Sequence, residues 1–530
     1  MQTKPSFITL ILCALAPGMQ AEVKPNALFS YNAVLQQNAA VPVWGTASPG
    51  EEVTVAFGNQ SKTVKADETG KWLVKLDPMP ASAEPRDMTI TGNLKSQISN
   101  LKCSSVLVGE VWVCSGQSNM AMGGKADPTA TTTKVRMFTV DPKYSLKPQT
   151  ELTGKWAECT GSVASAVGYF FGRDVAKATK VPVGMIRSSV GGTAAALWTS
   201  LAGLEKEPKF SVYAEPTREA LANYDAAMAK YPQEVADYQV KLKEWETNGG
   251  KAYEDAKKAL ALENKKNKAE GKPMLPQPKP TTPKPIMPGS PDSGGFSGLY
   301  NGMIAPLMPY AIKGVVWYQG ESNAGKAFEY RTLFPRMIAD WREQWGQGAF
   351  PFFFVQIAPH NGQPPELREA QFLTSKNTPN TAMAVITDIG DAVNIHPPQK
   401  EPVGARLALA ARALTYGEQI EYSGPEYDSF KVDKNKVVLS FKHVGGGLLA
   451  KDGPLKGFTI AGADKKFVEA KAEIVGNTVV VSSDQVAAPV AARFGWANVP
   501  DVNFWNKDGL PASPFRTDPE AIAAETPKGK

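Results

Sequence analysis

Histidine and cysteine are scarce in this sequence, and their scarcity removes two classes of function. The 530 residues include three histidines and four cysteines, and no two cysteines stand at the C-x-x-C spacing of zinc sites. We therefore expect neither a metal centre nor a bound cofactor. A disulfide-stapled scaffold is also disfavoured, although one disulfide among Cys103, Cys114 and Cys159 is left open.

Long apolar runs are also missing. The run from Phe7 to Ala16 ends before small residues near Ala21 and is too short for a membrane span, which needs about 20 residues. Because Lys4 precedes it, we interpret residues 1–21 as an export signal. Lipid modification at Cys13 is the alternative, but that site requires a small residue where this chain has Leu12. The sequence thus predicts a secreted or periplasmic protein without a membrane partner.

The excess of positive charge is small for the length. The formal net charge of +6 is diluted over the chain, and the lysines gather in one helical stretch without interleaved aromatics. We interpret this charge as solvated surface and expect no nucleic-acid partner. With 42% apolar residues, the chain has enough material for two or three domains. The sequence leaves the oligomeric state open.

Apolar and polar residues alternate near both ends of the mature chain. Val53, Val55 and Phe57 show this period of two, and a comparable pattern returns after Ser423, which predicts two β-rich regions. Between them, continuous apolar runs alternate with helical patterns, as is typical of a parallel sheet covered on both faces. The expected α/β organisation is a signal at 1–21, a β-sandwich at 22–105, a catalytic region at 106–422 and a β-rich region at 423–530.

One segment, residues 201–291, interrupts the middle region. Apolar residues repeat at intervals of three and four from Leu221 to Trp245, the spacing of a helix with a narrow apolar seam. Asn248-Gly249-Gly250 should break this helix and the spacing resumes at Tyr253, so we predict an antiparallel helical hairpin. Eight prolines from Pro273 to Pro291 predict a stiff extended return. We interpret the insertion as a wall of the cleft, with a partner-binding coiled coil as the alternative.

A strand-like run leads directly into a small polar turn at residues 111–120, Val-Trp-Val-Cys-Ser-Gly-Gln-Ser-Asn-Met. Hydrolytic α/β enzymes expose a nucleophilic hydroxyl at such a strand end, and Ser118 is the candidate here. The second glycine of the G-x-S-x-G elbow is absent, which disfavours an ordinary α/β-hydrolase. Taken alone, a serine in a polar turn is usually a turn former.

Two further turns, Ser188 to Thr193 and Gln319 to Asn323, also follow expected strands. Glycines at strand ends let backbone N–H groups face a cleft, and Gln and Asn side chains add donors. Each turn alone is explained as an ordinary connection between a strand and a helix, but the three turns together predict an oxyanion hole. The candidate oxyanion and substrate-binding residues are Gln117, Asn119, Gly191, Gly192, Gln319, Gly320, Glu321 and Asn323.

A serine nucleophile needs a base, and the imidazoles of this chain are His360, His396 and His443. His396 lies just beyond the expected strand ending at Asp388 and just before an apolar helix, so we assign it as the general base. His360 follows a strand and is a candidate for lining the pocket. His443 stands beside a run of glycines in the C-terminal region, where a surface loop is expected.

Several motifs occur in order along the chain: Val-Leu-Gln at 34–36, Gly-Gln-Ser-Asn-Met at 116–120, Gly-Gly-Thr at 191–193, Trp-Tyr-Gln-Gly-Glu-Ser-Asn at 317–323, Asp-Ile-Gly-Asp at 388–391, Ile-His-Pro at 395–397 and Asp-Gly-Leu-Pro-Ala-Ser-Pro-Phe-Arg at 508–516. This set resembles the sialate O-acetylesterase-like family of SGNH hydrolases over nearly all of the mature chain. The resemblance implies a three-layer parallel-sheet catalytic domain and an esterase acting on acetylated sugars or glycans.

The resemblance also implies a mechanism at the matching positions. Ser118 would attack the acetyl carbonyl, and His396 would take its proton and pass it to the sugar oxygen. The backbone N–H groups of Ser118 and Gly192, with a donor from the 319–323 turn, would stabilise the oxyanion. Glu321 is expected to brace that turn by hydrogen bonding.

The chain departs from the family pattern beside its histidine. Many SGNH enzymes carry an aspartate three residues before the histidine, where this chain has Val393. The group that orients His396 is then Asp391, Asp388 or a backbone carbonyl, the last of which would make a catalytic dyad. We rank Asp391 first.

The substrate is less well defined than the chemistry. We expect acetylated sialic acids first and acetylated hemicellulose, such as xylan or xyloglucan, as the alternative. A carbohydrate-binding protein with an inert middle region is the alternative of another class. A lipase is disfavoured because the sequence shows no exposed apolar lid.

Overall fold

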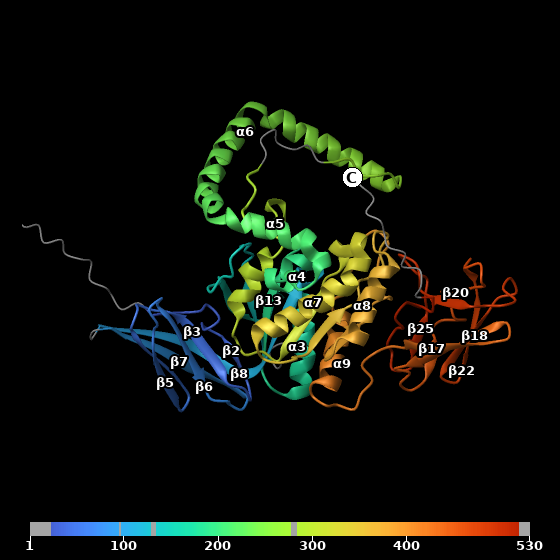
Figure 1. Cartoon of the computed structure of the whole chain (residues 1–530), viewed down its shortest axis with the longest axis horizontal. Coiled ribbons are helices and arrows are strands. Elements are labelled where there is room, and N and C mark those ends of the chain that lie inside the picture. The colour runs from blue at the N-terminus through green and yellow to red at the C-terminus, as the bar shows by residue number, and fades with distance from the viewer. Residues whose placement is uncertain (1–22, 95–96, 129–133, 277–283, 519–530) are drawn as a thin grey trace, which may run out of the picture.

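The computed structural model describes residues 23–94, 97–128, 134–276 and 284–518. An N-terminal β region and a C-terminal β region flank a mixed α/β middle, and the long helix α6 arches over that middle (Figure 1). The expected export signal lies outside the described residues. Within these ranges, no helix combines the length and the apolar character that a bilayer span requires.

The middle region is built on one large mixed sheet. Its strands lie in the order β11-β10-β13-β8-β14-β15-β16, and neighbours are parallel except β11 and β10. Buried apolar runs form β8, β13, β14, β15 and β16, as predicted, whereas β10 and the largely exposed β11 were not predicted. Their bounds are β8 (Gln97–Gly116), β10 (Val135–Val140), β11 (Gly154–Glu158), β13 (Val183–Ser189), β14 (Gly314–Tyr318), β15 (Phe352–Val355) and β16 (Thr381–Ala384).

Helices pack on both sides of this sheet because successive strand residues point to opposite faces. Trp112 and Cys114 of β8 belong to the core formed with α3 (Ala166–Thr179) and α9 (Glu401–Leu414). Val113, on the opposite face, belongs to the core formed with α7 (Ala327–Trp345) and α8 (Pro365–Asn377).

The N-terminal region is a pair of packed β layers. One layer holds β1 (Lys24–Pro25), β3 (Val41–Thr46) and β6 (Lys71–Leu76); the other holds β4 (Glu52–Phe57), β5 (Gln60–Lys65) and β7 (Ser82–Leu94), which pairs with β8. The predicted alternation is confirmed in β4 and β6, whose apolar residues are buried in one core. The short β2 (Val34–Gln36) runs parallel to β8. Strand β8 therefore continues across residue 105, where the sequence placed a boundary.

The C-terminal region contains three small antiparallel sheets around an aromatic core that includes Phe458, Phe494 and Phe504. The strands of the first are β17 (Glu426–Asp433), β18 (Lys436–Lys442), β22 (Lys471–Val475) and β23 (Thr478–Ser482). Those of the other two are β19 (Leu448–Ala450) with β25 (Phe504–Asn506), and β20 (Phe458–Ala461), β21 (Val468–Glu469), β24 (Ala491–Phe494) and β26 (Phe515–Arg516).

The insertion differs from its prediction. After α4 (Leu201–Glu205) and α5 (Ser211–Ala222), the chain forms one long helix, α6 (Tyr224–Ala269), which continues without a break across Gly249 and Gly250. The predicted helical hairpin is therefore wrong. Each glycine costs about 1 kcal/mol of helix stability relative to alanine, and the surrounding alanine, lysine and glutamate residues favour helix. Part of the proline-rich return, residues 277–283, lies outside the described residues.

The three cysteines in the described part of the chain are buried free thiols, so the disulfide left open by the composition is not formed. Burial raises the pKa of Cys103 to about 11 and the pKa values of Cys114 and Cys159 to about 12. Thiols with such high pKa values stay protonated at neutral pH and are weak nucleophiles.

Trp317 anchors the core on the α7 side of the sheet, where its ring contacts Trp198, Phe334 and Trp341. We expect Trp317→Ala to lower the free energy of unfolding by about 3–5 kcal/mol, because it leaves a large cavity. Denaturant unfolding followed by circular dichroism measures the change. Phe328→Ala is the control, since that side chain is 49% exposed, and an equal loss in both variants would contradict the assignment.

Candidate active site

Ser118 lies at the carboxyl edge of the sheet, two residues after β8 ends. It is the first residue of the short helix α1 (Ser118–Ala121), and the chain reaches it through Gly116 at a φ of +132°. A Cβ atom on Gly116 would lie 2.1 Å from the carbonyl oxygen of Tyr318 on β14. Only glycine therefore allows β8 and β14 to approach closely while the chain turns to present the hydroxyl.

His396 reaches Ser118 from a distant part of the sequence. It lies in the loop between β16 and α9, and its Nε2 atom is 2.7 Å from the Ser118 hydroxyl oxygen. Burial lowers the pKa of His396, and the charges of Lys400 and His360 lower it further. A lowered pKa keeps the imidazole neutral at mildly acidic pH, the form that accepts a proton.

The two candidate aspartates are engaged elsewhere. Asp391 Oδ1 accepts hydrogen bonds from the backbone N–H groups of Val393 (2.8 Å) and Asn394 (2.6 Å), and Asp388 forms a two-pronged ion pair with Arg406. Neither carboxylate forms a hydrogen bond with His396 in the described structure. The expectation that Asp391 orients the imidazole finds no support in this geometry. The Oδ1 atom of Asp391 instead accepts hydrogen bonds from the turn that leads to the histidine.

A buried polar network lies beneath the serine and the histidine. The Asn119 side chain donates to Glu321 Oε1 (2.7 Å) and to the carbonyl of Ile395 (3.1 Å), and its Oδ1 accepts from Lys400 Nζ at 2.5 Å. One amide thus joins α1, the turn after β14 and the residue preceding His396. Since Ile395 is bonded covalently to the histidine, this network fixes the backbone that carries the base.

Lys400 is a site residue that the sequence analysis missed. Its side chain is buried, and burial lowers the pKa of its ammonium group to about 8, although the negative charge of Glu321 acts to raise that pKa. Burial in turn raises the pKa of Glu321. Lys400 is the N-cap residue of α9, where the helix dipole disfavours a cation. A lysine at that place, four residues after the candidate base, is the signal that could have revealed it.

The glycine turn after β13 borders the serine. A Cβ on Gly191 would lie 3.3 Å from the Cβ of Ser118, and Gly192 is exposed at a φ of +72°. Asn323, in the 3-10 helix η6 (Glu321–Lys326), accepts hydrogen bonds at Oδ1 from Ala195 N and Gln319 Nε2. Its side-chain NH₂ makes no hydrogen bond within the described residues, so these donors are available to a ligand.

Three of the predicted binding residues brace the turns instead. Gln319 donates to Thr193 O (3.1 Å) as well as to Asn323, and Gln117 Oε1 accepts from Ser322 N at 3.3 Å. A Cβ on Gly320 would lie 2.6 Å from an Ile357 methyl carbon. The two glutamine side chains hold the turns together by hydrogen bonds, and the absence of a side chain at Gly320 lets Ile357 pack close to the turn. The sequence motif alone did not distinguish these structural roles from contact with a ligand.

The remaining histidines occupy different positions. His360 lies beside the His396 loop, where its Nδ1 accepts from Gly362 N and its Nε2 is 3.3 Å from Val393 O. The backbone N–H of His360 donates to Asn498 O, so a loop of the C-terminal region reaches this side of the site. His443 pairs with Glu421 at 2.8 Å. Within the described residues, no three His, Cys, Asp or Glu side chains gather as metal ligands.

Comparisons with known proteins agree on one family. The family model "Carbohydrate esterase, sialic acid-specific acetylesterase" matches residues 108–264 and 293–412, more than half of the chain. Sialate O-acetylesterase of Mus musculus is 29% identical over 447 residues, 75% of this chain and 74% of that protein, and the Homo sapiens protein is 28% identical over 460 residues. A solved carbohydrate acetylesterase from Xanthomonas citri is 34% identical, covers 94% of this chain and 100% of its own, and superposes with a TM-score of 0.73.

The electrostatic role of Lys400 can be tested through His396. We expect Lys400→Met to raise the pKa of His396 toward 6.5, because a nearby positive charge is removed. NMR titration of histidine side chains measures this directly, since the chain has three histidines to assign. Lys376→Met, which removes an exposed lysine paired with Glu426, is the control for loss of a lysine charge elsewhere and should leave the pKa unchanged. An unchanged or lower pKa in Lys400→Met would contradict the role.

Proposed function

Because the chain belongs to the sialic acid-specific acetylesterase family of carbohydrate esterases, we propose that it removes O-acetyl groups from sialic acids with Ser118 as its nucleophile. Hydrolysis of acetyl esters on carbohydrates is the activity that the family and its similar proteins share. The observation that carries the serine mechanism is the 2.7 Å contact between His396 Nε2 and the Ser118 hydroxyl.

The proposed reaction has two steps. His396 Nε2 takes the proton of Ser118 as the serine oxygen attacks the acetyl carbonyl, and the imidazolium then passes the proton to the departing sugar oxygen. This leaves an acetyl ester on Ser118. In the second step, His396 takes a proton from water, the hydroxide attacks the acetyl group, and the proton returns to the serine oxygen as acetic acid leaves and ionises to acetate.

The oxyanion of each tetrahedral intermediate needs donors fixed in advance. The free NH₂ of Asn323 and the backbone N–H groups of Ser118 and Gly192 are the proposed donors. Asn323 is held by two hydrogen bonds to its Oδ1, so its donors need little reorganisation during the reaction. Each such donor lowers the barrier by on the order of 3 kcal/mol.

We infer that the site works as a serine–histidine dyad. Asp391 and Asp388 are engaged by other donors, whereas Asn119 holds the backbone beside His396. Lys400 disfavours the protonated imidazole, which supports a base that is neutral before the reaction. In this proposal the asparagine network replaces a carboxylate as the element that positions the histidine.

Three further proposals concern the organisation of the chain. We propose that residues 106–422 form an SGNH-type three-layer domain, supported by helices on both faces of the parallel strands. The flanking regions 22–105 and 423–530 are proposed as β-rich regions, the first of which shares strand β8 with the catalytic sheet. Residues 1–21 are proposed to direct export, so that the enzyme meets its glycans in the periplasm or outside the cell.

The substrate class is tested by comparing acetate release from O-acetylated sialic acid, acetylxylan and acetylated xyloglucan under identical conditions. The proposal expects the highest kcat/KM for the sialic acid. A higher value for either hemicellulose would replace the proposed substrate and leave the esterase mechanism intact.

The nucleophile is tested by Ser118→Ala. We expect acetate release to fall at least a thousandfold, on the order of the contribution of a catalytic serine, while the sugar still binds. Ser322→Ala, which changes an exposed serine in the neighbouring turn, is the matched control and should keep its activity. Undiminished turnover in Ser118→Ala would overturn the mechanism, and no acetate release from the unaltered chain would favour a carbohydrate-binding protein.

The dyad is tested by Asp391→Asn, which removes the charge but keeps an oxygen to accept from Val393 and Asn394. We expect kcat to change by less than about threefold. An aspartate that orients a catalytic histidine contributes about 10⁴ in kcat. A loss of that size would restore Asp391 as the third member of a triad.

A further inference from the structure

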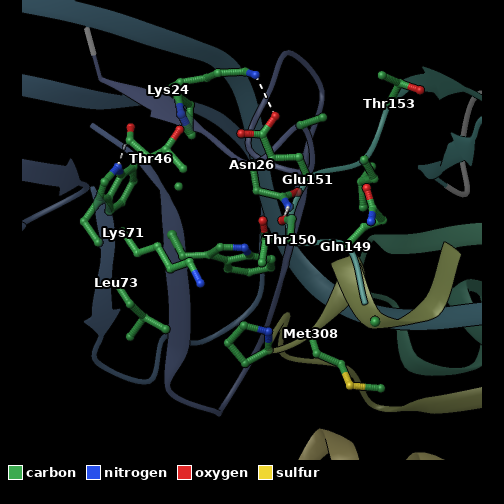
Figure 2. A pocket seen from close by; sticks show the side chains of 18 of the residues that line it. Lys24, Asn26, Thr46, Lys71, Leu73, Gln149, Thr150, Glu151, Thr153 and Met308 are labelled. Atoms are coloured by element: carbon green, nitrogen blue, oxygen red, sulfur yellow. Dashed lines mark hydrogen bonds and ion pairs between the residues drawn. The ribbon is translucent and has the colours of Figure 1, made fainter. Parts of the chain in front are cut away.

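A cavity lies where the N-terminal β region meets the middle region. Its volume is about 740 Å³, within the usual range for small-molecule sites. The sheet β1-β3-β6 and the end of β5 form one wall, and the loop from β10 to β11 with residues 305–309 forms the other (Figure 2). Neither Ser118 nor His396 lines it, so it is distinct from the proposed active site.

The inner surface of this cavity is largely apolar. Trp44 and Trp72 lie in its wall, and Leu73, Met308 and Pro309 add aliphatic surface. Trp72 Nε1 donates to Thr46 O at 3.0 Å, whereas Trp44 Nε1 has no hydrogen-bond partner within the described residues. Leu73 is 39% exposed although its β6 neighbours Trp72 and Val74 are buried. Aromatic and aliphatic surfaces of this kind pack against the apolar face of a sugar ring.

Positive charge is concentrated at the rim. Lys24 and Glu151 form an ion pair at 2.7 Å, and Lys143 Nζ donates to Gln149 Oε1. Lys65 and Lys71 form no ion pair within the part of the chain that the structure describes, and the Lys71 amine points into the hollow (Figure 2). Two ammonium groups are therefore available to an anionic ligand.

The neighbouring acidic side chain does not cancel these charges by contact. Asp67 Oδ1 accepts from Thr69 N (2.8 Å), Thr69 Oγ1 (2.7 Å) and the backbone N–H of Lys71 (3.0 Å), which commits it to its own turn. The cavity thus combines an apolar wall, a free indole N–H and two ammonium groups. A carboxylate on the ligand would pair with these two charges, which otherwise face solvent.

We propose that this cavity is a non-catalytic binding site for an oligosaccharide unit that carries a carboxylate. The ring packs against Trp44 and Leu73, and the carboxylate is held by Lys65 and Lys71. A sialic acid and a uronic acid share this chemistry. The role of the site rests on the proposed function, because a glycan held here would be retained by the enzyme while its acetyl groups are hydrolysed elsewhere.

Binding is measured by calorimetric titration of the full chain carrying Ser118→Ala, so that the readout does not depend on turnover. The unacetylated probes are a sialylated trisaccharide, a xylo-oligosaccharide bearing glucuronic acid, and the neutral xylo-oligosaccharide of equal length. We expect one or both carboxylated probes to bind more tightly than the neutral one, and the tighter of the two identifies the source of the carboxylate.

The site is located by Lys65→Met combined with Lys71→Met, which should raise the Kd of the carboxylated probe at least about tenfold. Lys75→Met is the matched control, since Lys75 is exposed on the same face of β6 but does not line the cavity. Leu73→Ala should weaken binding of every probe that the cavity holds. In the unaltered Ser118 background, these variants should hydrolyse p-nitrophenyl acetate normally and show a raised KM for the acetylated polymer.

The proposal is overturned if no carboxylated probe binds, if the neutral probe binds equally well, or if Lys65→Met with Lys71→Met leaves the Kd unchanged. These outcomes are separate from failure of the proposed function. Loss of the esterase activity itself would appear as absent p-nitrophenyl acetate hydrolysis by the unaltered chain, whatever the titrations give.

Discussion

The hydrogen bonds of the Asn119 side chain are the constraint on which the site depends. A buried polar group is costly unless it is paired, and Asn119 is paired with Glu321, Lys400 and the carbonyl of Ile395 at once. These partners come from two segments, at residue 321 and at residues 395–400, which are far apart in the sequence from each other and from Asn119. Because each segment also carries or borders a group that faces the substrate, satisfying this one amide assembles the site.

Strand β8 extends this constraint to the rest of the molecule. Its first half pairs with β7 of the N-terminal region, and its second half lies between β13 and β14 before delivering Ser118. The N-terminal layers are therefore hydrogen-bonded into the same sheet that carries the nucleophile. This continuity keeps the lysine-lined cavity at a fixed place relative to the proposed active site, as a glycan-binding element would need.

Sequence reasoning predicted the buried strands and the meeting of Ser118 with His396, because the carboxyl ends of parallel strands share one edge of a sheet. It did not resolve the surroundings of the imidazole, since the path of a single loop decides that Asp391 caps a turn. Lys400 escaped notice because burial, which sequence does not show, gives that lysine its role. The helix through Gly249 shows the same limit, since neighbouring residues outweighed the local glycine signal.

Covalent trapping tests the central claim, a Ser118 hydroxyl activated by His396, most directly. After reaction with an organophosphate ester, which phosphorylates activated serines, mass spectrometry of peptides locates the label. The account predicts the label on Ser118, with a labelling rate that falls about a hundredfold in His396→Gln and stays unchanged in Asp391→Asn. A label on another residue, or equal labelling in His396→Gln, would contradict it.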